Sequence, residues 1–145
     1  MNRGDLVLVR FHLITKVNKM GFRVLLIAVT GKELSEIHAE YAVVPTDRYE
    51  EIPESPVTGA TLASGAYLLY INDRIDPDDA VFAKLSQRSS LIACYANETV
   101  MNSFASAWRN GVEQWSVFHD AEQGVKHLET KGDVPAALNA DFRGP

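Results

Sequence analysis

Hydrophobic residues gather along this chain in short runs typical of β-strands, and the first two runs predict a hairpin. Residues 5–17 (DLVLVRFHLITKV) and 22–30 (FRVLLIAVT) are rich in β-branched and aromatic side chains. The segment between them, NKMG at 18–21, ends in a turn glycine, so we expect the two strands to pair antiparallel. Both runs are nearly continuous in apolar residues, which indicates strands buried on both faces.

A short helix is predicted directly after the second strand. Thr30 and Glu33 have the spacing of a capping box, in which a hydroxyl and a carboxylate satisfy free backbone N–H groups. Apolar residues at helical spacing then extend the helix to about Ala42; they are Leu34, Ile37 and Tyr41.

A second helix is predicted over residues 76–90. Asp76 suits the N-cap and Pro77 the first helical position, while Asp78 and Asp79 favour the positive end of the helix dipole. Its apolar face is formed by Val81, Phe82 and Leu85. Because capping explains the aspartates, we assign no metal ion to them.

Between the two helices, residues 43–65 are predicted to form a long acidic, proline-rich surface loop. Prolines remove backbone donors and interrupt periodic structure. A loop of this length is uncommon in a compact domain and is often functional or mobile.

The rest of the chain predicts a strand at residues 66–73 and a three-strand meander at 91–97, 99–109 and 112–120. A short strand or helix is expected near residues 125–129. The whole chain, residues 1–145, is therefore predicted to be a single α+β domain. Its sheet is mainly antiparallel, with an N-terminal hairpin, a C-terminal meander and two or three helices packed on it.

The Asn110-Gly111 pair predicts a two-residue hairpin turn in this meander. Strict pairing from that turn places Trp108 opposite Glu113 and Ser106 opposite Trp115. It puts both tryptophans and His119 on one face, and it points the neighbouring Asp120 to the other, so His119 and Asp120 cannot form a catalytic dyad. A slip of one residue would exchange the faces.

The shared tryptophan face has two interpretations. It packs on the second helix as part of the core, or part of it contacts a ligand or protein, because tryptophan is enriched at binding hot spots.

Composition indicates a soluble globular protein, with 46% hydrophobic and 23% charged residues in a chain of 145. One cysteine, Cys94, excludes an intrachain disulfide and fits a reducing compartment. The N-terminal runs do not have the pattern of a signal peptide. No run approaches the ~20 apolar residues of a membrane helix. We therefore expect a cytoplasmic protein with no membrane partner.

The net charge of −5 is unevenly distributed. Residues 39–79 contain nine acidic and two basic residues, a net charge of −7. Such a surface repels nucleic acid and suits a basic protein partner. The alternative is that these acids only keep a loop solvated.

No strong catalytic, metal or nucleotide motif is present. Cys94 lies in an apolar strand, which is typical of a core cysteine. His119 and His127 could meet if the chain turns at Gly124, and zinc could then use Asp120 or Glu122 as well. The four histidines are otherwise dispersed, so no catalytic residue, metal or cofactor is assigned and a non-enzymatic role is favoured.

These patterns favour a protein that works by binding another protein, with a basic protein as the suited partner, as a bacterial toxin-neutralising immunity protein does. The candidate contacts are Asp47, Glu50, Glu51 and Glu54 in the acidic loop, with Trp108 and Arg109 at the hairpin tip. The alternative is a small-ligand-binding protein or enzyme whose pocket is lined by Trp115, His119 and Tyr95. A third possibility is self-association through an exposed sheet face.

Overall fold

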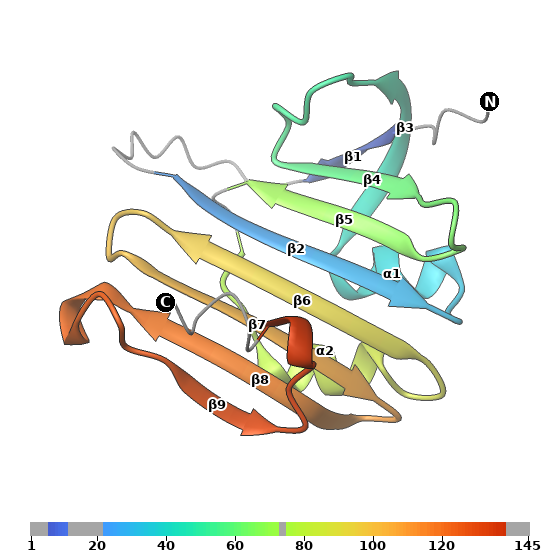
Figure 1. Ribbon diagram of the computed structural model, residues 1–145. Helices are drawn as coiled ribbons and strands as arrows, with labels where there is room; N and C mark the ends of the chain where they lie inside the picture. The colour runs from blue at the N-terminus through green and yellow to red at the C-terminus, as the bar shows by residue number, and fades with distance from the viewer. Residues whose placement is uncertain (1–5, 12–21, 73–74, 139–145) are drawn as a thin grey trace.

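A computed structural model of the protein describes residues 6–11, 22–72 and 75–138, and all strands in these ranges belong to one antiparallel sheet (Figure 1). The strands lie side by side in the order β3-β1-β4-β5-β2-β6-β7-β8-β9. Their bounds are β1 (Leu6–Phe11), β2 (Arg23–Thr30), β3 (Val43–Tyr49), β4 (Val57–Thr61), β5 (Tyr67–Asn72), β6 (Ser90–Asn97), β7 (Asn102–Arg109), β8 (Val112–Asp120) and β9 (Glu129–Gly132).

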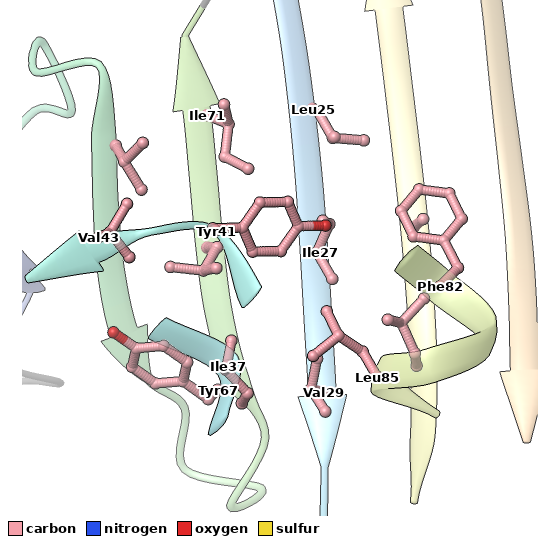
Figure 2. Close-up of a cluster of buried hydrophobic side chains, with 14 of the residues drawn as sticks. Leu25, Ile27, Val29, Ile37, Tyr41, Val43, Tyr67, Ile71, Phe82 and Leu85 are labelled. Carbon is pink, nitrogen blue, oxygen red and sulfur yellow. The ribbon is translucent and has the colours of Figure 1, made fainter. Parts of the chain in front are cut away.

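Two seven-residue helices, α1 (Leu34–Glu40) and α2 (Asp79–Leu85), cover the same face of this sheet (Figures 1 and 2). A third, 3-10 helix, η1 (Ala121–Gln123), follows β8. The core lies between the helices and the central strands, where Ile27 of β2, Ile37 of α1 and Phe82 of α2 are fully buried. The α+β class and the predicted meander of β6, β7 and β8 are confirmed.

Among the helices of the described ranges, none has the length and apolar character that crossing a membrane requires.

The predicted N-terminal hairpin is wrong, because β1 and β2 are not neighbours. β1 pairs with β3 and β4, whereas β2 pairs with β5 and β6. The predicted turn at residues 18–21 lies outside the described residues. The predicted burial of this strand on both faces holds for β2 only in part: the adjacent Val24 and Leu25 are both buried, but Leu26 and Ala28 are only half-buried. Apolar continuity could not indicate the partner, since a buried strand needs two neighbours and any apolar strand of suitable length can supply them.

The predicted long loop at residues 43–65 is also wrong, because it contains β3 and β4. β3 is an edge strand, where a proline such as Pro45 costs no interior hydrogen bond. β4 is an interior strand, and the lack of a side chain at Gly59 leaves room for the ring of Tyr67. A Cβ on Gly59 would overlap the hydroxyl of Tyr67, which is buried and lies 2.8 Å from Nε2 of His38.

Both helix starts differ from the prediction by a few residues. Glu33 is the N-cap of α1 and makes no side-chain capping bond, so the predicted capping box with Thr30 does not form. α2 begins at Asp79, and Asp78 caps it by accepting a hydrogen bond from the Ala80 N–H at 2.9 Å. Asp76, the predicted cap, instead forms an ion pair with Arg23 of β2 at 2.8 Å.

The predicted turn of the β7–β8 hairpin is confirmed, but the register beyond its tip is wrong. Asn110 and Gly111 have φ values of 50° and 79°, as a type I′ turn requires. A β-bulge then leaves Gln114 without a partner and places Trp115 opposite Ala107. The shift of one residue moves Trp115 to the face of the sheet opposite that of Trp108.

Gly132 of β9 makes room for this bulge, and this yields a stability prediction. Gly132 has φ +71°, and a Cβ there would overlap the backbone carbonyl of Gln114. Gly132→Ala should lower the free energy of unfolding by about 2 kcal/mol, because strained backbone and steric overlap act together. Urea denaturation measures the loss, and faster amide exchange of Thr130 would show that β9 has detached.

Gly65→Ala is the matched control for this prediction. Gly65 also has a positive φ, of +89°, but a Cβ there would meet no atom within 4 Å. Its cost should be about 1 kcal/mol, the backbone strain alone. Equal losses for the two variants would show that the bulge does not depend on Gly132.

Candidate functional site

The candidate binding residues lie in two separate regions of the sheet. Asp47, Glu50, Glu51 and Glu54 belong to β3 and to the loop that follows it, whereas the tryptophans, Arg109 and His119 belong to β7 and β8. Five strands lie between β3 and β7, which corresponds to about 30 Å at the usual strand spacing. The two groups therefore cannot form one small site.

Trp108 lies in the core. Its side chain is 8% exposed and its ring centroid is 6.2 Å from that of Phe82 in α2. The indole N–H donates to the Ser106 hydroxyl at 3.1 Å. This placement agrees with the interpretation that Trp108 packs on the second helix.

The tip of the hairpin is attached to the C-terminal end of α2. The Gly111 N–H donates to the hydroxyl of the fully buried Ser86 at 3.1 Å, and the Asn110 N–H donates to the Ser89 carbonyl at 3.2 Å. Arg109 is exposed beside this anchored tip. Its neighbours are thus held in place while its guanidinium faces solvent.

Trp115 and His119 lie on the opposite face of β8, where a pocket of about 140 Å³ opens. The pocket includes His119 but neither Trp115 nor Tyr95; its lining is Ser103, Phe104, Ala105, Val117, His119, Leu128 and Leu138. Tyr95 instead packs on Phe104 with ring centroids 5.7 Å apart. The expectation that Trp115, His119 and Tyr95 share one pocket is therefore wrong, because the bulge and the alternation of β6 separate them.

His119 and His127 meet, as the turn near Gly124 predicted, with ring centroids 6.2 Å apart. His119 Nδ1 donates to the His127 carbonyl at 2.6 Å, which in a neutral imidazole leaves Nε2 as an acceptor. His127 Nδ1 accepts the Asp120 N–H at 2.9 Å, and its Nε2 lies 3.1 Å from the Glu129 carboxylate. His119 Nε2 has no hydrogen-bond partner among the described residues.

A search of the described residues for three or more His, Cys, Asp or Glu side chains able to hold a metal ion found no such group. Cys94, on β6, is exposed, and partial burial raises the pKa of its thiol. A thiol with a raised pKa is a weak nucleophile at neutral pH.

Glu50 organises the loop of residues 50–56 that joins β3 to β4. Its carboxylate accepts the N–H groups of Glu54 and Ser55 at 3.0 and 3.1 Å, together with the Ser55 hydroxyl. From β5, the Asn72 side-chain amide donates to the Pro53 and Ser55 carbonyls, both at 3.0 Å. These bonds hold the loop in one conformation.

The other three acids, Asp47, Glu51 and Glu54, are exposed. Two large apolar side chains lie among them in sequence and are also exposed, Tyr49 to 59% and Ile52 to 70%. We call these five residues the acidic edge; Figure 1 shows their loop at the end of the molecule far from β8 and β9. Tyr49 and Ile52 were not among the predicted contacts. The sequence feature that could have identified them is the presence of two large apolar residues, Tyr49 and Ile52, within a proline-rich acidic segment.

Comparisons with known proteins found no family model, no curated protein and no solved structure that matches the chain.

The role of Glu50 predicts how the loop responds to acid. The Ser55 hydroxyl, with the N–H groups of Ser55 and Glu54, holds the pKa of the Glu50 carboxyl below its usual 4.5. Since the folded-state pKa is the lower one, stabilisation by Glu50 is complete above pH 4.5 and is lost as the pH falls through the folded-state pKa. The NMR amide shifts of Glu54 and Ser55 should titrate together below pH 4.5.

Glu50→Gln should abolish this shared titration, whereas Glu51→Gln should leave it intact. If the Ser55 amide still titrates in Glu50→Gln, another carboxylate orders the loop.

Proposed function

We propose that this protein acts by binding a basic protein partner through the acidic edge. The observation that carries the proposal is the loop of residues 50–56, which hydrogen bonds hold in place while it exposes large apolar side chains among acids. A loop that is already ordered loses little conformational entropy on binding.

The composition of the acidic edge supports contact with a protein. Tyrosine is enriched at binding hot spots, and Tyr49 lies at the end of β3 beside the exposed Ile52. Exposed carboxylates of Asp47, Glu51 and Glu54 surround them in sequence. Such charges accelerate encounter with a cationic surface and disfavour anionic partners.

β3 contributes a second feature, since among the described strands it is the last of the sheet and pairs only with β1. The outer backbone groups of an edge strand can pair with an extended segment of another chain. An acidic inhibitor that blocks a basic toxin is the kind of complex that suits this surface, and an immunity-type role is the form of the proposal we favour.

A charge-reversal comparison tests this function. The full chain and its Glu51→Lys variant serve as baits in lysate from the source organism, with binding then measured on the recovered partner. The native chain should retain a basic protein in stoichiometric amount, and Glu51→Lys should weaken binding about tenfold at low salt. Glu122→Lys, an equal charge change on η1, should have little effect.

Recovery of no stoichiometric partner, or equal loss for the two lysine variants, would contradict the proposal. Sedimentation of the purified chain as a dimer, with no second protein bound, would instead favour self-association.

The pocket at His119 supports a second candidate function, binding or turnover of a small ligand. Its apolar wall of Ala105, Val117, Leu128 and Leu138 lies beside His119, whose Nε2 has no hydrogen-bond partner among the described residues. A neutral imidazole in such a position can accept a hydrogen bond or a proton from a ligand.

Replacement of His119 by asparagine or glutamine tests the roles of the two ring nitrogens, Nδ1 and Nε2, one at a time. The amide of His119→Asn can reach the position of Nδ1 and keep the bond to the His127 carbonyl, whereas His119→Gln reaches the position of Nε2. Ligand binding in an NMR fragment screen, followed at the Val117 and Leu138 amides, should be lost in His119→Asn at nearly unchanged Tm. His119→Gln should retain part of it. Equal binding by all three proteins would contradict a role for Nε2.

A further inference from the structure

A larger pocket, of about 280 Å³, lies between the C-terminal end of α1 and the start of α2, and none of its residues belongs to the acidic edge or to the pocket at His119. It is lined by Glu40, Tyr41, Ala42, Ile75, Asp76, Asp78 and Val81. Drug-sized ligands occupy about 300–1,000 Å³, so this pocket suits a smaller molecule. Its described wall combines apolar side chains with three carboxylates and one phenol, and no basic side chain is among these residues.

Tyr41 gives the first indication of a ligand. The residue is 7% exposed, and Figure 2 shows its ring lying over β2 with the hydroxyl directed toward α2. Its hydroxyl makes no hydrogen bond to any described residue, and the hydroxyl oxygen is not fully buried, so it is accessible to a ligand in the pocket that Tyr41 lines. Burial, with the Glu40 and Asp78 carboxylates nearby, raises the pKa of Tyr41, so the hydroxyl keeps its proton.

The carboxylates of the pocket give the second indication. Glu40 is neutralised by Lys84 at 2.7 Å and Asp76 by Arg23 at 2.8 Å. Asp78 uses one oxygen to cap Ala80 and, within the described ranges, has no cation at ion-pair distance. Among the described residues, Asp78 is therefore the one carboxylate of the wall that is not paired with a cation.

We propose that this pocket binds a small organic ammonium ion with an apolar body. The ammonium group lies between the Asp78 carboxylate and Tyr41, whose hydroxyl oxygen accepts a hydrogen bond and whose ring attracts a cation. The apolar body packs against Ile75 and Val81. Carboxylates on both sides of the pocket disfavour an anion of the same shape.

Phenethylamine is a suitable probe, with 3-phenylpropionate as the charge-reversed control of similar size. Titrated into the full chain and followed by NMR, phenethylamine should shift the amides of Tyr41 and Val81 with saturation in the millimolar range. 3-Phenylpropionate should cause no saturable shift there.

Three single variants locate the ammonium group. Asp78→Asn keeps a good N-cap for α2 but removes the charge, and it should weaken phenethylamine binding about fivefold. Tyr41→Phe removes a hydroxyl that has no partner among the described residues, so it should leave Tm unchanged and weaken binding about fivefold. Asp79→Asn, an equal charge change one residue along α2 but outside the pocket, should bind like the native chain.

The proposal is overturned if phenethylamine gives no saturable shift at Tyr41 and Val81, or if 3-phenylpropionate binds equally well. It is also overturned if Asp78→Asn and Asp79→Asn weaken binding to the same extent, which would reduce the effect to overall charge. None of these results bears on the acidic edge, because the two surfaces share no residue.

Discussion

Burial of the inner face of the sheet by two short helices is the interaction on which the structure depends. Phe82 and Leu85 of α2 and Ile37 of α1 contribute fully or almost fully buried side chains to one core with Leu25 and Ile27 of β2. Seven-residue helices are not stable alone in water, so α1 and α2 exist because this apolar face covers them. Packing of the two helices on the sheet positions the pocket between α1 and α2 and the hairpin tip that is bonded to the end of α2.

Packing against α2 also explains why the tip of the β7–β8 hairpin, which carries both tryptophans, stabilises the fold. Trp108 packs on Phe82, and the turn is hydrogen-bonded to Ser86 and Ser89 after α2. The surfaces we associate with binding lie elsewhere, at the edge strand β3, at the outer face of β8 and between the two helices. They are marked by exposed apolar side chains, by an imidazole nitrogen of His119 and by the hydroxyl of Tyr41, neither of which has a hydrogen-bond partner among the described residues.

Local chemistry accounts for the parts that the sequence predicted well. The Asn110-Gly111 turn needs two residues that tolerate positive φ, so it is decided within four residues. The presence of α2 was predicted from equally local signals, but its N-cap is Asp78, while the predicted cap Asp76 pairs with Arg23 of β2. The faces of β8 were predicted incorrectly because strict alternation has no place for an extra residue. The bulge at Gln114 lies against Gly132 of β9, which approaches it only in the folded sheet.

By itself, the sequence determined the class of the fold, most of its strands, the two helices and the meander, because periodicity and turn preferences act over a few residues. Only the tertiary structure decided which strands pair, which faces the tryptophans occupy and which polar groups meet. β1 and β2 have similar patterns but different neighbours, since pairing is selected by burial of whole faces. Tyr41 and Asp78 belong to segments far apart in sequence, and packing of α1 and α2 on one face brings them to a common pocket.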